Sequence, residues 1–193
     1  MTTILLARHG ETDWNREYRF QGRADPPLNG TGRAQAAQLA GALASEALAA
    51  VYSSPLRRAF ETAEVVARAH GLEPVAVEGL REVDVGSWQG LTRAEVEDRF
   101  PEQYAHWINY GQGWNDGETY EQMGKRVVAT LLELAAGHDG ERILAVTHGG
   151  PIRAAFAFAD RTSHAEARRR GPSIGNVFLA ELAVEKGALR RLD

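Results

Sequence analysis

Imidazole and guanidinium side chains stand in three short polar motifs, namely Arg8-His9, Arg57-Arg58 and His148 before a pair of glycines. A guanidinium group suits phosphoryl oxygens because its planar fork can bind two of them at once. An unprotonated imidazole is a nucleophile near neutral pH. If these motifs meet in space, they provide the residue types that move a phosphoryl group without a metal ion.

A transfer of this kind also needs an acid that protonates the departing oxygen. The segment LREVDVGSW offers two carboxylates, Glu82 and Asp84. Nearby negative charge or burial can raise the pKa of a glutamate enough for it to serve as that acid. Residues two apart share a face of an extended segment, so Asp84 is the expected substitute if Glu82 points away from the site.

The elements that must position these residues follow from the pattern of apolar side chains. The apolar runs at residues 3–7, 49–53, 74–77 and 142–146 are typical of buried strands. Helices are predicted at residues 32–44, from Pro55 to about 70, at 91–110 with an interruption at Pro101, at 118–136 and from Pro151. Residues 176–182 and 188–192 predict a hairpin that turns at Lys186-Gly187.

Strands that alternate with helices predict an α/β fold, a three-layer sandwich whose mostly parallel central sheet is flanked by helices. The length fits a single domain, 1–193, with a small helical cap around residues 91–118. Ligands bind outside the carboxyl ends of the strands in such sheets. Three predicted strands end in polar motifs, at Arg8, Ser53 and His148, so we expect these motifs to converge. Taken singly, each of these residues would more often be structural or exposed to solvent.

Composition narrows the classes of function. The chain has no cysteine, which excludes thiolate nucleophiles, disulfides and cysteine-based zinc sites. A net charge of −4 argues against non-specific nucleic-acid binding, which needs a basic face. No apolar run approaches the roughly 20 residues that span a bilayer or the roughly 7–15 of a signal peptide. We therefore expect a cytoplasmic protein that uses no cofactor or metal and binds neither nucleic acid nor membrane.

Longer strings in the sequence resemble a known family. They are LLARHGETDWN, FQGRADPPLNGTGRAQA, SSPLRRAFETA, LREVDVGSWQG, NDGET and VTHGG, in this order over nearly the whole chain. Together they resemble the histidine phosphatase superfamily, the phosphoglycerate mutase-like proteins. The resemblance implies that His9 accepts the phosphoryl group and that Glu82 is the general acid. It implies that Arg8, Arg58 and His148 hold the phosphoryl oxygens, Arg58 being preferred to Arg57 because it precedes the alanine of the RAxxTA pattern.

The same resemblance implies a phosphate pocket that includes Asn15, Gln21, Gly22 and Gly149. The expected activity is hydrolysis of a small-molecule phosphate monoester through a phosphohistidine on His9. The expected partner is a small phosphorylated metabolite, such as a phosphoglycerate, a sugar phosphate, a nucleotide monophosphate or α-ribazole phosphate. The sequence leaves a homodimer open, and the apolar stretch 176–182 is a candidate sheet edge for pairing unless a helix covers it.

Four alternatives compete with this interpretation. A phosphoglycerate mutase would use the same histidine, but the resemblance implies additional segments over the site, and none lies between Glu82 and Glu118. A metal enzyme could draw on ligand-type side chains in residues 9–13, although their spacing fits no helical metal motif. A non-catalytic module could bind a phosphorylated ligand with the same phosphate clamp, the residues Arg8, Arg58 and His148. A nucleotide fold is suggested by Gly30-Thr31-Gly32, but no strand is predicted directly before it.

Specificity is expected to depend on residues outside the motifs. Four aromatic residues are concentrated in one segment and predict either packing of the cap or a wall for the organic part of the substrate: Tyr104, Trp107, Tyr110 and Trp114. The loop after His9 could recognise a second negative group of the substrate through Trp14, Arg16, Tyr18, Arg19 and Arg23. The basic run 168–170 is interpreted as a solvated helix end.

Overall fold

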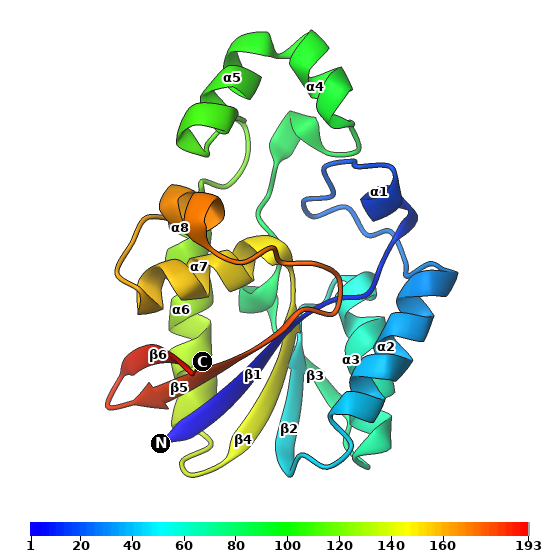
Figure 1. Cartoon of the computed structure of the whole chain (residues 1–193), viewed down its shortest axis with the longest axis vertical. Coiled ribbons are helices and arrows are strands. Elements are labelled where there is room, and N and C mark those ends of the chain that lie inside the picture. Colours follow the sequence, from blue (N-terminus) through cyan, green and yellow to red (C-terminus); the bar gives the residue numbers. More distant parts are fainter. Residues whose placement is uncertain (193) are drawn as a thin grey trace.

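A computed structural model describes residues 1–192 of the chain (Figure 1). Within them lies a six-stranded sheet in the order β3-β2-β4-β1-β5-β6. Its strands are β1 (Thr2–Arg8), β2 (Leu48–Ser53), β3 (Pro74–Ala76), β4 (Arg142–Thr147), β5 (Leu179–Glu185) and β6 (Ala188–Leu192). The first four run parallel, whereas β5 and β6 are antiparallel to their neighbours. The predicted α/β fold with a mostly parallel sheet is confirmed.

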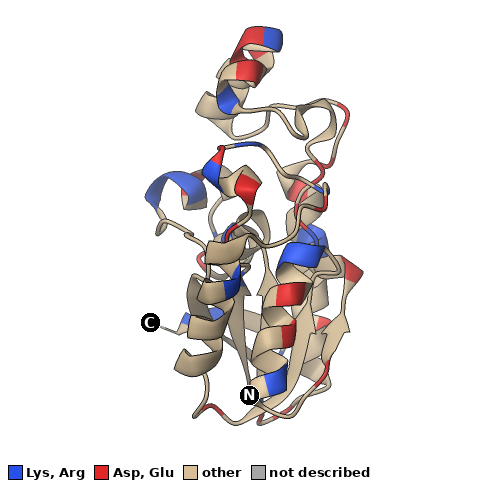
Figure 2. Ribbon diagram, turned by 90° about the vertical axis from the view of Figure 1, so that its right-hand side faces the viewer, with Lys and Arg blue, Asp and Glu red and all other residues tan. Residues whose placement is uncertain are grey.

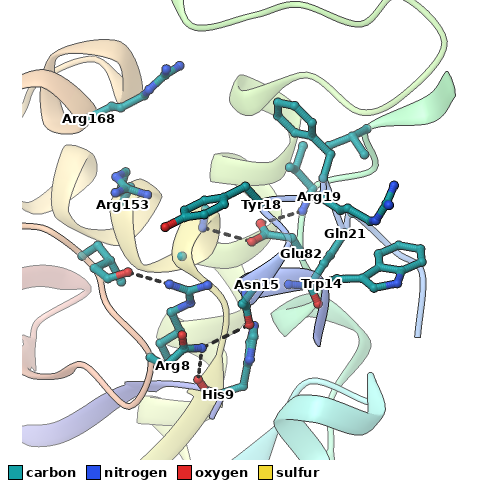
Figure 3. A pocket seen from close by; sticks show the side chains of 18 of the residues that line it. Arg8, His9, Trp14, Asn15, Tyr18, Arg19, Gln21, Glu82, Arg153 and Arg168 are labelled. Atoms are coloured by element: carbon teal, nitrogen blue, oxygen red, sulfur yellow. Dashed lines mark hydrogen bonds between the residues drawn. The ribbon is translucent and has the colours of Figure 1, made fainter. Parts of the chain in front are cut away.

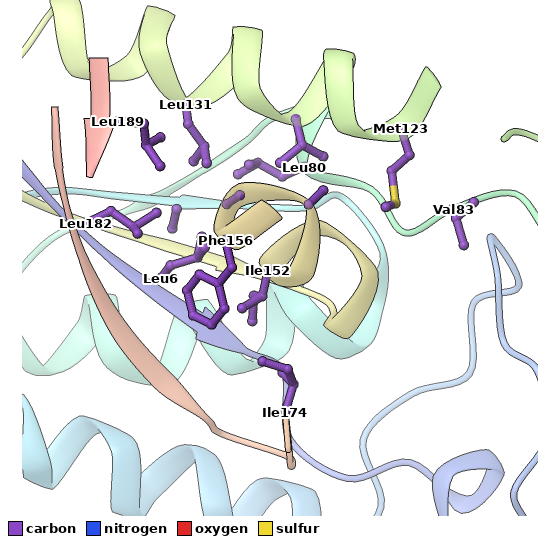
Figure 4. Packing of buried hydrophobic residues seen from close by; sticks show 14 of the residues in the cluster. Leu6, Leu80, Val83, Met123, Leu131, Ile152, Phe156, Ile174, Leu182 and Leu189 are labelled. Atoms are coloured by element: carbon purple, nitrogen blue, oxygen red, sulfur yellow. The ribbon is translucent and has the colours of Figure 1, made fainter. Parts of the chain in front are cut away.

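Helices cover both faces of the sheet, and the alternation of side chains in β1 explains how. Leu5 and Ala7 pack with α2 (Gly30–Ala42) and α3 (Arg57–Ala69) on one face. Ile4 and Leu6 pack on the other face with α6 (Tyr120–Ala136) and α7 (Gly149–Ala159), as Figure 4 shows around Leu6. Because successive side chains of a strand point to opposite faces, one continuous apolar run supplies both layers of the core.

The remaining helices lie outside these two layers. They are α1 (Asp13–Arg16), α4 (Arg93–Arg99), α5 (Pro101–Tyr110) and α8 (His164–Arg170), with 3₁₀ turns at Glu78–Leu80 and Gly86–Trp88. Figure 1 shows α4 and α5 beyond the carboxyl ends of the parallel strands. Thr92 caps α4. Pro101 restarts the helix after Phe100, and the sequence predicts this interruption. The division of the chain into a domain and a cap stays a prediction.

Several boundaries differ from the sequence-based ones for local reasons. The loop after His9 contains the short helix α1, because Thr12 and Asn15 form a capping box that the prediction overlooked. Helix α2 begins two residues early because the Asn29 side chain accepts a hydrogen bond from the amide of Gly32. Helix α3 begins at Arg57 rather than at Pro55, because Leu56 is still extended.

The prediction of a free sheet edge at residues 176–182 is wrong. Strand β5 begins only at Leu179 and pairs with β1 on one side and β6 on the other. The hairpin turn at Lys186-Gly187 is confirmed, and both residues have positive φ angles, as a tight hairpin turn requires. The edges of the sheet are β3 and β6 instead.

Two glycines bring the start of α2 against the loop that follows β1. A Cβ on Gly10 would overlap the carbonyl of Gly32, and a Cβ on Gly32 would overlap the backbone of Glu11. The close backbone approach, rather than a nucleotide, therefore explains the glycine at position 32. The structure also places a loop, not a strand, directly before Gly30, as expected. None of the helices within residues 1–192 combines the length and apolar composition that a membrane crossing requires.

Candidate active site

A cavity of about 540 Å³ lies where the polar motifs converge (Figure 3). Eight of the nine predicted site residues line it: Arg8, His9, Asn15, Gln21, Gly22, Arg58, Glu82 and Gly149. They come from the end of β1 and the loop after it, the first turn of α3, the segment between the two 3₁₀ turns, and the start of α7. The ninth, His148, is fully buried and lies beside His9 rather than on the cavity wall.

The hydrogen bonds of His9 fix its tautomer. Its Nδ1 lies 2.6 Å from the carbonyl oxygen of Gly10, which can only accept, so Nδ1 carries the proton. Its Nε2 lies 3.3 Å from Nε of Arg58, which can only donate, so Nε2 is unprotonated. At 3.3 Å this contact is beyond the usual range for an N–H donor, so Arg58 engages the lone pair of Nε2 only weakly.

Electrostatics also favour the neutral form of His9. Burial lowers the pKa of its imidazole well below the ordinary value of 6.5, and the charges of Arg58 and Arg8 lower it further. The ring is 2% exposed although it lines the cavity. A buried, unprotonated nitrogen that is influenced by two nearby cations has the properties of a nucleophile that attacks an anionic phosphoryl group.

Arg58 is held rigidly beside this nitrogen. The side chain is 1% exposed, and its two terminal nitrogens donate to the carbonyl oxygens of Ala24 and Gly22 at 2.6 and 2.9 Å. Burial lowers the pKa of Arg58 to about 10, while Glu82 and Asp25 oppose the shift, so the group is still charged at neutral pH. Its neighbour Arg57 has a side chain that is 60% exposed and pairs with Glu61. The structure therefore places Arg58, and not Arg57, in the cavity.

Arg8 approaches the cavity from the end of β1. One terminal nitrogen donates to the carbonyl oxygen of Ile174 at 2.7 Å, and Nε is buried without a partner among the described residues. Burial lowers the pKa of Arg8, and the nearby carboxylate of Glu82 opposes that shift. A buried donor without a partner is costly, so a bound anion would stabilise it.

His148 supports the site from behind His9. The two imidazole rings meet edge to face with centroids 5.1 Å apart, and Nε2 of His148 lies 2.8 Å from Oγ of Ser54. Its Nδ1 is buried without a partner in residues 1–192. Burial lowers the pKa of His148 well below 6.5, and Arg58 and His9 add to the effect. In the free protein His148 is therefore a neutral group.

Of the two candidate acids, the structure places Glu82 on the cavity wall and turns Asp84 away. The Glu82 carboxylate accepts hydrogen bonds from the amides of Val83 and Gly150 at 2.9 and 3.3 Å (Figure 3). Asp84 instead accepts from the amide of Gly86 and lies 3.6 Å from Arg23. The substitute role foreseen for Asp84 is therefore not needed.

Asn176 is a cavity residue that the sequence did not identify. Its side-chain amide donates to the carbonyl oxygen of His9 at 3.1 Å and to Oδ1 of Asn15 at 3.3 Å. Asn15 also accepts from Thr12, which in turn donates to Gln21 at 3.1 Å. The motif residues Asn15 and Gln21 thus belong to one polar network with the nucleophile candidate, and Asn176 completes it from the segment before β5. Its side chain is not part of any motif string, so no sequence signal indicated this.

The four aromatic residues divide between the two roles that the sequence left open. Trp107, Tyr104 and Trp114 all pack around the buried Trp88, at ring distances of 6.0, 6.5 and 5.5 Å, and Trp107 also lines the cavity. Tyr110 does neither, since it is 69% exposed. Three of the four are therefore packing residues, and one of these, Trp107, is also a wall residue.

Only some of the loop residues that the sequence suggested for recognition of a second negative group line the cavity. Trp14, Tyr18 and Arg19 line the cavity, but Arg16 is exposed and pairs with Asp13, and Arg23 pairs with Glu118. The interpretation of the basic run as solvent-exposed is wrong for its first member. Arg168 lines the cavity because the turn of α8 directs it there, while Arg169 and Arg170 are exposed. Within residues 1–192, no three His, Asp or Glu side chains are grouped so that they could hold a metal ion.

Comparison with known proteins agrees with this geometry. Phosphoserine phosphatase 1 of Hydrogenobacter thermophilus is 35% identical over 158 residues, which cover 81% of this chain and 75% of that protein. The bifunctional protein Rv2228c of Mycobacterium tuberculosis is 34% identical over 193 residues, which cover 99% of this chain and 53% of that protein. The chain thus spans about half the length of that relative.

A solved structure and a family model extend the similarity to the whole fold. The structure of YhfR from Bacillus stearothermophilus superposes with a TM-score of 0.91 at 31% identity, covering 99% of this chain and 95% of that one. The model of the histidine phosphatase superfamily (branch 1) matches residues 4–192. Its fold, its converging motifs and this match show that the chain belongs to branch 1 of the histidine phosphatase superfamily.

Proposed function

We propose that this protein hydrolyses small phosphate monoesters in two steps through a phosphohistidine on His9. The observation that carries the proposal is the position of Nε2 of His9, which is unprotonated and lies 3.3 Å from Nε of Arg58 in a cavity that Arg8 also lines. Family membership and the phosphoserine phosphatase from Hydrogenobacter thermophilus support phosphatase chemistry.

In the first step, Nε2 of His9 attacks phosphorus as the bond from phosphorus to the ester oxygen breaks. Arg8 and Arg58 hold the equatorial oxygens and balance their charge, and His148 supports the imidazole that becomes phosphorylated. Glu82 gives its proton to the departing oxygen, which leaves as an alcohol. The proton on Nδ1 stays hydrogen-bonded to Gly10, so the ring keeps its orientation throughout.

In the second step, water attacks the phosphorus of the phosphohistidine and the bond from phosphorus to nitrogen breaks. The Glu82 carboxylate accepts a proton from the water, which returns the glutamate to its starting state. Inorganic phosphate leaves and Nε2 recovers its lone pair. Such a sequence produces ping-pong kinetics, in which the alcohol departs before water reacts.

The proposal is tested by trapping the intermediate. The protein is mixed with a ³²P-labelled monoester and quenched in alkali, where a phosphohistidine survives and a phosphoserine ester does not. We expect label bound to the protein, released by mild acid and located on the peptide that contains His9. Hydrolysis without any acid-labile label, or label on another residue, would overturn the proposal.

The same assay separates the alternatives. A mutase would return the label from His9 to a second hydroxyl and release little phosphate. A metal enzyme would lose its phosphatase activity in excess chelator, whereas the proposed mechanism predicts full activity there. A non-catalytic binding module would hold the labelled monoester without becoming labelled itself.

The state of His9 predicts a distinctive response to pH. Because the pKa of His9 is lowered, its ring stays neutral as the pH falls through 6.5 and gains a proton only in more acidic solution. We therefore expect the ¹⁵N resonances of His9 in the free protein to show a neutral ring, with the proton on Nδ1, from pH 8 down to pH 6. A titration midpoint at or above pH 6.5, or a proton on Nε2, would contradict the assigned nucleophile.

A further inference from the structure

The cavity contains more positive charge than one phosphate needs. Within the described residues, its wall includes a single carboxylate, Glu82, and six arginines: Arg8, Arg19, Arg58, Arg93, Arg153 and Arg168. This excess stands in a chain whose net charge is −4. Arg8 and Arg58 are assigned to the phosphoryl group, and Arg19 is neutralised by Glu17 and Glu95. The other three have no role in the proposed hydrolysis.

Arg153 stands next to the phosphate clamp. It follows Gly149 by one turn of α7, and an atom added to Gly149 as Cβ would lie 3.6 Å from Nη1 of Arg153 and 4.0 Å from Nε of Arg8. The Nε of Arg153 is buried without a partner, and the side chain forms no ion pair with any residue in 1–192. It is therefore a cationic donor without an ion-pair partner among residues 1–192, and it lines the same cavity as Arg8 and His9.

Arg168 continues this positive surface away from the clamp. Its guanidinium carbon lies 3.9 Å from the ring centroid of Trp107, and Nη1 donates to the Trp107 carbonyl oxygen at 3.2 Å. It forms no ion pair with any residue in 1–192, unlike its exposed neighbour Arg170, which pairs with Glu166. The stacked position fixes the guanidinium plane, so its remaining donors are oriented before a ligand arrives. Figure 3 shows Arg153 between Arg8 and Arg168, and Figure 2 shows the basic end of α8.

His164 adds neutral hydrogen-bonding capacity to the same wall. Its ring stacks on Tyr120 with centroids 3.9 Å apart, and both ring nitrogens are buried without a partner among residues 1–192. Burial lowers the pKa of His164 to about 4, and the charges of Arg153 and Arg168 contribute to that shift. Buried donors and acceptors left without partners are costly, so this wall is arranged for a polar ligand group.

We propose that Arg153 and Arg168 form a second anion subsite, which binds a carboxylate carried by the organic part of the phosphate monoester. The inference rests on the proposed phosphatase and deepens it by naming the substrate class, the phosphorylated hydroxy acids. Arg153 binds the carboxylate through its fork, while Arg168 and His164 complete the wall around it. Recognition of a second negative group, which the sequence suggested for the loop after His9, is thus assigned mainly to α7 and α8.

The short distance between this subsite and the transferring phosphoryl group favours a carboxylate over a second phosphate. Because Arg153 and Arg8 both approach Gly149, a group bound by Arg153 must be carried only a few bonds from the ester oxygen, as when the carboxylate stands on the carbon next to the esterified one. A second phosphate at that distance would bring about two negative charges near the transferring group, and their repulsion grows as the separation falls. One carboxylate adds one charge, which one guanidinium matches in geometry and sign.

The test compares two substrates that differ only by a carboxylate, O-phosphoserine and phosphoethanolamine. We expect the wild-type protein to have the higher kcat/KM for O-phosphoserine. The variant Arg153→Met is expected to reduce the ratio of the two kcat/KM values by about 10- to 100-fold, the range of a lost charge-assisted hydrogen bond. Arg153→Lys, which keeps the charge, is expected to restore part of the ratio. Arg169→Met is the matched control, since Arg169 is exposed in the same helical turn as Arg168.

Two outcomes would overturn the subsite. One is a wild-type protein that does not distinguish the two substrates, and the other is an Arg153→Met variant with an unchanged ratio. Calorimetric binding of the same pair to His9→Ala separates the subsite from the phosphatase. Preferential binding of O-phosphoserine without hydrolysis by the wild type would uphold the subsite and overturn the phosphatase. Equal binding together with hydrolysis would overturn the subsite alone.

Discussion

The variant His9→Ala is expected to lose phosphatase activity by at least about 10⁴-fold, with the remaining rate close to that of the buffer. Removal of a covalent nucleophile abolishes the two-step route, and the clamp alone cannot replace it. The measurement is release of inorganic phosphate from a monoester at saturating substrate. The acid-labile label on the protein should disappear in the same variant.

Folding and binding need separate measurement in this variant. His9 is buried, so its loss leaves a small cavity, and thermal unfolding of the variant should show whether the fold persists. The control is His70→Ala, because His70 follows α3 at the end opposite to Arg58. Retention of more than about a hundredth of the activity by a folded His9→Ala protein would place the nucleophile elsewhere.

The variant Arg58→Met is expected to lose about 10²- to 10³-fold in kcat/KM, the range for removal of one fixed donor to a developing charge. Methionine keeps much of the apolar volume but removes the charge and the donors. The carbonyl oxygens of Gly22 and Ala24 would lose their partners as well, so we expect a stability loss of about 1–3 kcal/mol. Steady-state kinetics and chemical denaturation measure the two effects independently.

Arg57→Met is the matched control for this effect. Arg57 precedes Arg58 in the same helix, but its side chain is exposed and, within residues 1–192, forms an ion pair only with Glu61. A salt bridge of this kind contributes little to stability, so activity and stability should both stay within about twofold and about 0.5 kcal/mol of the wild type. If both variants lose activity equally, the clamp does not depend on the position of Arg58, and its assignment is wrong.

Arg58 also shows how far the sequence could predict the site. The two adjacent arginines have the same chemistry, and a helix directs neighbouring side chains about 100° apart. Only one of them can therefore face the end of β1. The motif pattern selected Arg58, and the structure agrees because α3 buries Ala59, Thr62 and Ala63 together with it.

The position of the remaining cavity residues depended on tertiary packing. Arg153 lies between two buried neighbours in α7, Ile152 and Ala154, and its direction follows from how those residues meet the core. Arg168 belongs to a run of three arginines, of which the docking of α8 directs one into the cavity. Asn176 acts on His9 from 167 residues away along the chain. Local sequence patterns contain no information about contacts between side chains that are far apart along the chain.

The sequence by itself determined the fold class, the strand ends at which the polar motifs converge, and the candidate site residues His9, Arg8, Arg58 and Glu82. It could do so because contiguous motifs encode short-range geometry, and because parallel strands bring their carboxyl ends to one edge of the sheet. Only the tertiary structure decided the tautomer of His9, the place of His148 behind it and the second group of arginines. These features depend on which faces of separate helices meet, and that is set by packing of the whole core.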